Sequence, residues 1–229
     1  MAEPHALVEV ILGGTSLDKA KKRAALAVAA GADRIAIATP LIYSEGYRAI
    51  SEVKALASTI PVLADLKVHD GCHLFLTEAR RRGADIGTVA AYSNYVGCRE
   101  GVRARSDCGI GIVADLTCIP LSTFGRQAAE IAAVGVDGLA LARGHDTARY
   151  EESRAEYDGL DQLRSSVSIP LGCTVSSVKT AQIALALGAD WVSLDEGVAN
   201  EDLHDAVQTL RKAPSGKFRS PAASGYSRT

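Results

Sequence analysis

Short apolar runs recur along the chain, and amphipathic segments, usually rich in alanine, lie between them. Four of these runs follow a Gly-x-Asp tripeptide, which recurs at offsets of 52, 52 and 53 residues. The tripeptides are Gly31-Ala-Asp33, Gly83-Ala-Asp85, Gly135-Val-Asp137 and Gly188-Ala-Asp190. A glycine that ends a helix, followed by a tight turn and a buried strand, gives this order. The pattern therefore predicts strands at residues 35–38, 86–90, 139–142 and 192–194.

A second set of apolar runs alternates with the first and predicts strands at 8–12, 62–66, 110–116 and 169–173. The amphipathic segments predict helices at 17–30, 47–57, 72–82, 97–105, 124–134, 160–166, 178–187 and 202–210. Eight strands alternating with eight helices, in four similar quarters, indicate an α/β protein with the (β/α)8 TIM-barrel fold. A doubly wound open sheet is the alternative, but it does not require a fourfold period. We expect residues 1–212 to form this single domain.

The third predicted strand carries charges in an otherwise apolar segment, Ile60-Pro-Val-Leu-Ala-Asp-Leu-Lys-Val-His-Asp-Gly71. Side chains alternate along a strand, so Asp65 and Lys67 are expected on one face. Buried charges are unfavourable unless they pair, and such pairs often mark functional sites. A lysine beside carboxylates can be held charged and can protonate a carbanion or enolate. The alternative is a structural ion pair that closes the strand.

Composition excludes several function classes. The 229 residues have a formal net charge of −2 and 5% aromatic residues, which gives no electrostatic footprint for nucleic acid or an anionic membrane. No apolar run approaches the roughly 18 residues that span a bilayer, and no signal peptide is apparent. Five cysteines without a CxxC pair argue against a disulfide framework. We therefore expect a cytoplasmic protein, with a flexible C-terminal tail at 213–229, where Ser, Gly, Pro and basic residues replace the apolar pattern.

In barrels of this type the chemistry lies at the carboxyl ends of the strands. Reading those ends gives Asp65, Lys67 and Asp70 as catalytic candidates from the third strand. The candidate substrate-binding residues, taken from the ends of four other strands, are Thr39, Asp115, His145, Asp195, Glu196 and Gly197.

The segment Asp65-x-Lys67-x-x-Asp70 resembles the DxKxxD motif of the orotidine 5′-monophosphate decarboxylase superfamily. Within that superfamily, 3-hexulose-6-phosphate synthase and 3-keto-L-gulonate-6-phosphate decarboxylase are most similar. The likeness also includes Ile37-Ala-Thr-Pro-Leu-Ile42, Glu45-Gly46 and Gly83-Ala-Asp-Ile-Gly-Thr-Val89. The resemblance implies a homodimer with composite active sites, in which Asp70 reaches into the partner's site. It also implies that Lys67 is the acid/base group, that Asp65 is a site carboxylate and metal ligand, and that Asp115 is the family's acidic position on the fifth strand.

The chain departs from the resembled pattern at several positions. Ala36 stands where the sugar-phosphate branch has a metal-binding glutamate, so magnesium is possible but its site is weakened. The strand-one aspartate has no counterpart, and Glu9 lies deeper in that strand. His145 occupies a position that is arginine in the decarboxylase branch. No cofactor is therefore predicted with certainty.

In the resembled family the turn after the last strand binds phosphate, and in this chain that turn holds Asp195 and Glu196. If these carboxylates point inward they repel a phosphate dianion. If they point outward and cap the last helix, Gly197 remains free to bind phosphate.

These observations predict a carbon–carbon lyase, a decarboxylase or aldolase that works through an enediolate or carbanion. Its substrate is expected to be a small polyhydroxylated or β-keto compound of a specialised carbohydrate pathway. Two alternatives remain: an isomerase or epimerase that uses the same lysine and aspartates, and a non-catalytic ligand-binding barrel. The sequence leaves the substrate, its phosphorylation, the metal requirement and the choice between decarboxylation and aldol chemistry open.

Overall fold

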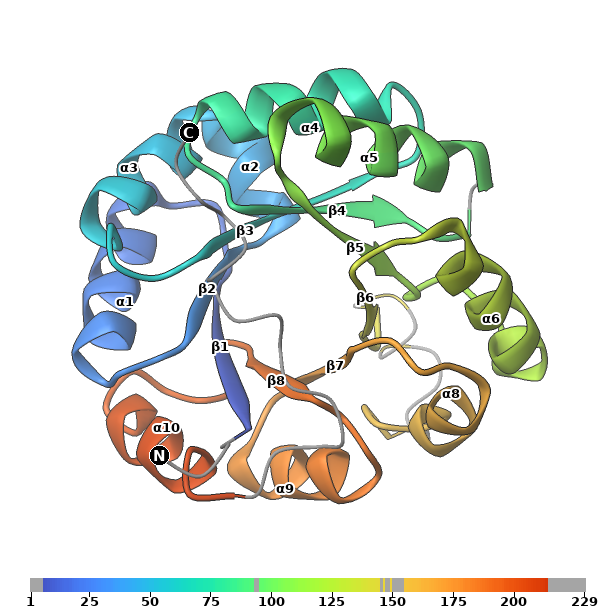
Figure 1. The fold of residues 1–229 in the computed structure, drawn as a ribbon. Helices are drawn as coiled ribbons and strands as arrows, with labels where there is room; N and C mark the ends of the chain where they lie inside the picture. The colour runs from blue at the N-terminus through green and yellow to red at the C-terminus, as the bar shows by residue number, and fades with distance from the viewer. Residues whose placement is uncertain (1–5, 93–94, 145, 147–148, 150–154, 214–229) are drawn as a thin grey trace, which may run out of the picture.

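The chain folds as a closed barrel of eight parallel strands surrounded by helices (Figure 1). The computed structural model describes residues 6–92, 95–144, 146, 149 and 155–213. Neighbouring strands pair in sequence order, and β8 pairs with β1, where Leu7 lies opposite Trp191. This closure confirms the predicted single-domain (β/α)8 barrel and rules out the open doubly wound sheet. The predicted tail, apart from Ala213, lies outside the described residues.

The strands are β1 (Leu7–Leu12), β2 (Arg34–Ile37), β3 (Val62–Val68), β4 (Ile86–Ala90), β5 (Gly111–Asp115), β6 (Gly138–Leu141), β7 (Leu171–Val175) and β8 (Trp191–Leu194). The helices are α1 (Leu17–Ala29), α2 (Thr39–Glu45), α3 (Arg48–Leu56), α4 (Cys72–Arg81), α5 (Tyr95–Cys108), α6 (Phe124–Val134), α8 (Leu160–Ser166), α9 (Val178–Ala186) and α10 (Leu203–Leu210), with a short 3₁₀ turn at Leu121–Thr123.

Four elements differ from the sequence prediction by more than one residue, and one of them, β3, ends at Val68, two residues later than predicted. Helix α2 was not predicted, although Pro40 near its start is typical of a first helical turn. Helix α5 extends beyond the predicted 97–105 at both ends. Strand β7 begins at Leu171, two residues later than predicted. Pro170 has no amide hydrogen to donate to a neighbouring strand, which favours this later start.

The Gly-x-Asp repeat builds a ring of aspartates at the amino-terminal ends of alternate strands. Each aspartate accepts a hydrogen bond from the first or second amide of the strand that precedes it in sequence. The bonds are Val8 N to Asp33 (3.0 Å), Val62 N to Asp85 (2.9 Å), Ile112 N to Asp137 (2.8 Å) and Leu171 N to Asp190 (2.8 Å). Each carboxylate also pairs with a basic side chain, for example Asp190 with Arg164 at 3.0 Å. The fourfold sequence period is therefore a structural feature of the end opposite the expected site.

Apolar side chains form a shell between the sheet and the helices and a smaller cluster inside the barrel. The inner cluster includes Ala36, Leu63, Val113 and Trp191. A Cβ atom on Gly172 would lie only 1.8 Å from Trp191 Cε2, so only glycine fits opposite this ring.

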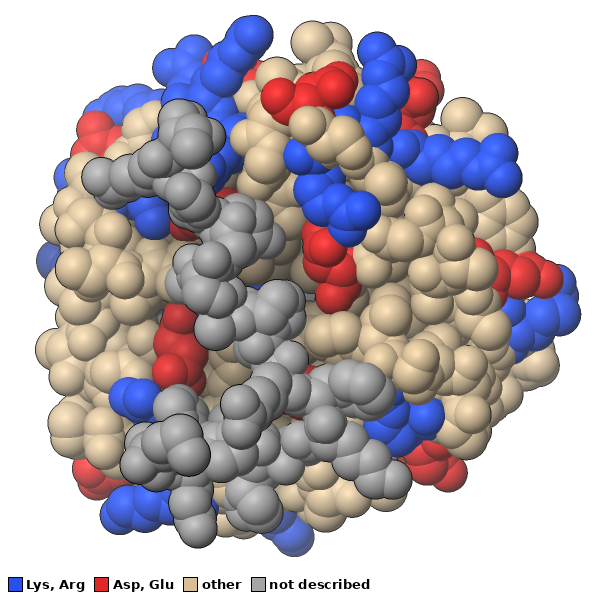
Figure 2. Space-filling model, in the orientation of Figure 1, with Lys and Arg blue, Asp and Glu red and all other residues tan. Residues whose placement is uncertain are grey.

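The face of the molecule shown in Figure 2 carries charged side chains of both signs. Lys and Arg side chains alternate with Asp and Glu side chains around the rim of the visible face (Figure 2). In the part of the chain that the structure describes, no helix is both long enough and apolar enough to span a bilayer.

Candidate active site

Lys67 lies in an irregular part of β3. Ala64 pairs with Gly87 and Val68 with Val89, so the three residues between them on β3 face Thr88 alone. Lys67 has a φ of 46°, and no other non-glycine residue in the described ranges has a positive φ. A side chain in this left-handed region costs roughly 1–2 kcal/mol, and such strain tends to occur at functional sites. The predicted meeting of Asp65 and Lys67 is confirmed, but through a bulge and not through regular alternation.

The Lys67 ammonium lies between two carboxylates. Nζ is 2.8 Å from Asp65 Oδ2, 3.0 Å from Asp65 Oδ1 and 2.8 Å from Asp115 Oδ2. Burial alone lowers the pKa of Lys67, but the charges of Asp65 and Asp115, with their hydrogen bonds, outweigh it and raise that pKa above the ordinary lysine value. The lysine is therefore held in its charged form.

Hydroxyl and amide groups hold the two carboxylates in place. The Thr88 hydroxyl donates to Asp65 Oδ1 at 2.9 Å and accepts from the Lys67 amide at 2.8 Å. The Thr39 hydroxyl lies 2.6 Å from the Asp65 carbonyl oxygen and 3.2 Å from Oδ2. The Thr117 amide donates to Asp115 Oδ1 at 3.0 Å. Residues from β3, β4, β5 and α2 thus fix one constellation.

This constellation remains open to solvent. The Lys67 side chain is 34% exposed, whereas the Asp115 side chain is only 6% exposed. A sealed structural ion pair would bury both side chains, so the partial exposure of the Lys67 side chain favours a site that a small molecule can reach.

The other predicted residues of the site do not all join it. Thr39 and Asp115 bind Asp65 and Lys67, as described above. Asp70 lies exposed in the loop between β3 and α4, within a single subunit. His145 lies outside the described residues.

The carboxylates of the turn after β8 do not have the helix-capping arrangement that was expected if they point outward. Asp195 Oδ1 accepts from the Gly197 amide at 2.7 Å, within its own turn. The Glu196 carboxyl group lies against Gly13, where a Cβ atom would be 2.8 Å from Glu196 Cδ. Neither caps α10, whose N-cap residue is Asp202.

A buried arginine beneath this turn offsets part of its negative charge. Arg23 of α1 donates to the carbonyl oxygens of Ile11 (3.0 Å), Val198 (2.9 Å) and Asp195 (2.7 Å). Burial lowers the pKa of Arg23, and the charges of Glu196 and Asp195 act in the opposite direction. The arginine thus joins the ends of β1 and β8.

The described residues do not fit the magnesium site of the resembled family. Ala36 is buried inside the barrel, and the Lys67 ammonium already contacts both Asp65 and Asp115. Glu9 pairs with Arg34 and accepts from the Ser193 hydroxyl at 2.6 Å, so its carboxylate is engaged deeper in the barrel. Within the described ranges, no group of three or more His, Cys, Asp or Glu side chains is arranged to hold a metal ion.

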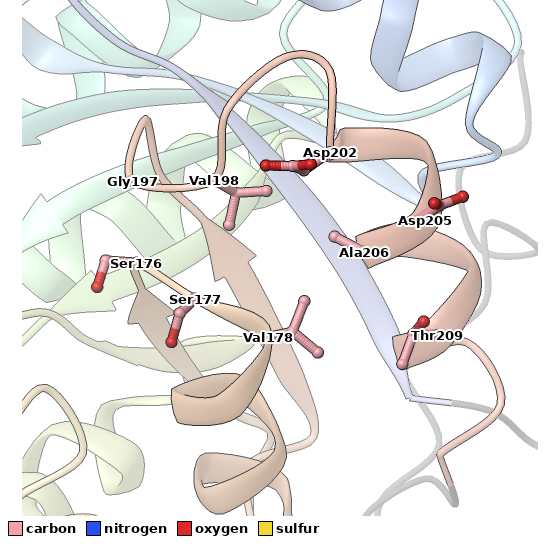
Figure 3. Close-up of a pocket in the computed structure, with 9 residues that line it drawn as sticks. All are labelled: Ser176, Ser177, Val178, Gly197, Val198, Asp202, Asp205, Ala206 and Thr209. Carbon is pink, nitrogen blue, oxygen red and sulfur yellow. The ribbon is translucent and has the colours of Figure 1, made fainter.

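A groove of about 330 Å³ lies between α9 and α10, outside the Lys67 constellation (Figure 3). Gly197 and Ser176 stand at one end of it, at the ends of β8 and β7, and Asp202 and Asp205 line the α10 side (Figure 3). The groove residues given by the described structure include these two carboxylates and no lysine or arginine, which makes the groove unfavourable for an anion.

Comparisons with known proteins agree with the barrel fold. Residues 14–215 match the family described as Orotidine 5'-phosphate decarboxylase / HUMPS. The 3-hexulose-6-phosphate synthase of Staphylococcus epidermidis is 26% identical over 188 residues, which cover 81% of this chain and 88% of that protein. The crystal structure of 3-hexulose-6-phosphate synthase from Salmonella typhimurium has a TM-score of 0.79 at 22% identity, covering 89% of this chain and 99% of that one. The 3-keto-L-gulonate-6-phosphate decarboxylase of Vibrio cholerae has a TM-score of 0.72 at 19% identity, covering 90% of this chain and 99% of that one.

The closed barrel and the match of most of the chain to synthases and decarboxylases define an enzyme of the lyase type. The chain belongs to the orotidine 5′-phosphate decarboxylase/HUMPS family.

Sequence reasoning missed three residues that shape the site. Thr88 lies within the segment Gly83–Val89, and a hydroxyl side chain in an otherwise apolar strand could have indicated a site residue. Arg23, on an alanine-rich helix, contacts residues more than 170 positions away, and Glu156 contacts Ser176 from the segment before α8. Neither contact leaves a local pattern in the sequence.

Proposed function

We propose that this protein is a carbon–carbon lyase that protonates a carbanion or enediolate with Lys67. The observation that carries the proposal is the Lys67 ammonium, hydrogen-bonded to Asp65 and Asp115 at the carboxyl ends of the barrel strands. The substrate is a small polyhydroxylated or β-keto compound, because a carbonyl next to the broken bond is needed to accept the electron pair.

The chemistry follows from where the electrons go. When the carbon–carbon bond breaks, one fragment leaves as carbon dioxide from a carboxylate, or as an aldehyde from an alcohol whose hydroxyl proton passes to solvent, and the bonding pair stays on the other fragment as an enediolate or carbanion. The Lys67 ammonium donates a proton to that carbon, and solvent then reprotonates the amine. Asp65 and Asp115 keep the lysine charged and positioned, which is the role of carboxylates beside a general acid.

We infer that magnesium is not required for this reaction. The inference is supported by Ala36 and by the ammonium that occupies the space between the two carboxylates. A magnesium site normally uses one or two free carboxylates, and both candidates here are bound to Lys67. Activity that a chelator abolishes and that magnesium restores would contradict this part of the proposal.

The proposal includes a homodimer with composite sites. Asp70 is exposed, and apolar side chains on neighbouring elements are also exposed: Tyr43 (83%), Leu74 (69%), Phe75 (44%), Tyr92 (56%) and Val96 (63%). Large exposed apolar side chains that lie near one another are typical of an interaction surface. If a partner subunit covered this surface, Asp70 of one subunit would lie next to the active site of the other.

Product analysis tests the proposed function. Candidate β-keto acids and ketoses, with and without phosphate, are incubated with the protein, and carbon dioxide, aldehydes and the remaining fragment are identified by NMR in D2O. The proposal predicts cleavage with deuterium incorporated at the carbon that carried the broken bond. Rearrangement without cleavage would identify an isomerase or epimerase, and binding without turnover would identify a ligand-binding barrel; either result contradicts the proposal.

A further inference from the structure

The turn after β7 already holds an anion that belongs to the chain itself. The Ser176 amide donates to Glu156 Oε2 at 3.1 Å, and the Ser176 hydroxyl donates to Glu156 Oε1. Helix α9 starts two residues later, at Val178. Both carboxylate oxygens of Glu156 are therefore bound at the amino-terminal approach to a helix, where backbone amides favour negative charge.

The adjacent turn after β8 repeats the arrangement. The Gly197 amide donates to the Asp195 carboxylate at 2.7 Å. The two turns touch, because a Cβ atom on Gly197 would lie 2.6 Å from Ser176 Cβ and 2.7 Å from the Ser176 carbonyl oxygen. Figure 3 shows Ser176 and Gly197 close together at the ends of these strands. Two neighbouring amides that an anionic ligand would use are thus bound to carboxylates of the chain.

A phosphate dianion that entered these turns would have to displace Glu156 and would remain close to Asp195. Like charges at such distances repel strongly in a partly buried site, whereas a hydroxyl or ammonium group can donate a hydrogen bond to a carboxylate. The two turns therefore disfavour a phosphorylated ligand for two reasons: their carboxylates repel the phosphate, and those carboxylates already bind the amides that the phosphate would need.

We propose that Glu156 is a specificity-determining residue that fills the anion position after β7, so that the substrate is unphosphorylated at this end. At this end the substrate carries an uncharged or cationic group that donates a hydrogen bond to the carboxylate of Glu156 or Asp195. This inference rests on the proposed function, because it specifies the class of substrate that binds at the mouth of the same barrel. It concerns Glu156, however, and not the Lys67 chemistry.

Calorimetric titration with inorganic phosphate tests this inference. Wild type is expected to show no binding in the millimolar range. Glu156→Ala frees the Ser176 amide and hydroxyl, and we expect it to bind phosphate at least about tenfold more tightly, the change that one hydrogen bond to a charged group supplies. Glu100→Ala is the matched control, because it removes the same charge from an exposed position on α5 and should behave as wild type.

Thermal unfolding of each variant establishes that it is folded. If Glu156→Ala fails to fold, Glu156→Gln replaces it, since it removes the charge and retains the shape, and it should also bind phosphate more tightly than wild type. Wild-type binding as tight as that of the variants overturns the inference, and so does a folded variant that gains no phosphate affinity. Repeating the titration with Lys67→Ala in the same chain separates this result from the lyase proposal, because phosphate binding at Ser176 does not involve Lys67.

Discussion

At the scale of single residues, Lys67 combines features that a structural role does not require. Its backbone has a positive φ, its amide is bound by a threonine hydroxyl, and its ammonium contacts two carboxylates while remaining partly exposed. The sequence allowed the prediction of the Asp65–Lys67 pair from charges in an apolar strand. It allowed the choice of Asp115 only as a strand-end acid, since Asp115 lies 48 positions after Lys67 and nothing in the sequence signals that the two pair.

The raised pKa of Lys67 predicts how stability depends on pH. The native lysine keeps its proton above the pKa of an unfolded lysine, about 10.4, so the native state then binds more protons than the unfolded state. The stabilisation from this charge is complete below that pH and is lost as the pH rises through the native pKa.

Denaturant unfolding of wild type and Lys67→Met at a series of pH values from 8 to 11 measures this effect. The difference in unfolding free energy between the two proteins should stay constant below about pH 10 and should fall above it. A difference that is the same at every pH contradicts the prediction. That the difference in unfolding free energy falls with rising pH follows from the raised pKa of Lys67 alone.

At the scale of elements, the sequence predicts all eight strands. Four of them follow the Gly-x-Asp repeat, in which the glycine forms the turn and the aspartate precedes the strand, and the other four are predicted by apolar runs. The bulge in β3 could not be predicted, since it depends on the register with β4. The later start of β7 follows from Pro170, which has no amide hydrogen to donate to a neighbouring strand. Helix α2 was also missed, because its seven residues are too few for a clear helical period.

The bulge depends on Thr88, which leads to a second prediction. Thr88→Val removes the hydroxyl that the Lys67 amide donates to and leaves that amide without its acceptor. We expect the free energy of unfolding in urea to fall by about 1–3 kcal/mol. Thr77→Val is the matched control: among the described residues the Thr77 hydroxyl is buried and has no hydrogen-bond partner, so its loss should be neutral or stabilising. Equal effects of the two substitutions would show that the Thr88 bridge does not hold the bulge.

At the scale of the whole molecule, the barrel brings four of the predicted catalytic or binding residues together and leaves Asp70 on the surface. A composite site in a homodimer accounts for that exposure and for the exposed apolar side chains on α2, α4 and α5. We expect light scattering to give the mass of a dimer. A monomer that is fully active at assay concentration would contradict the composite site.

Subunit mixing tests the composite site directly. In a mixture of Lys67→Ala and Asp70→Ala proteins, only the heterodimer has one intact site, in which Lys67 and Asp70 come from opposite sides of the interface. Each variant alone should be almost inactive, and random mixing should restore up to about a quarter of the wild-type activity, because half of the dimers then carry one good site of two. Activity that does not rise on mixing would place Asp70 outside the partner's site.

The most direct test of the central claim is the turnover rate of Lys67→Ala on the substrate that product analysis identifies. Loss of the general acid should lower the rate by about 10²–10⁴-fold. Lys22→Ala, at an exposed position on α1, is the control and should retain the wild-type rate. The circular dichroism spectra of both variants should match that of wild type. A Lys67→Ala enzyme that turns over at the wild-type rate would show that Lys67 does not protonate the carbanion.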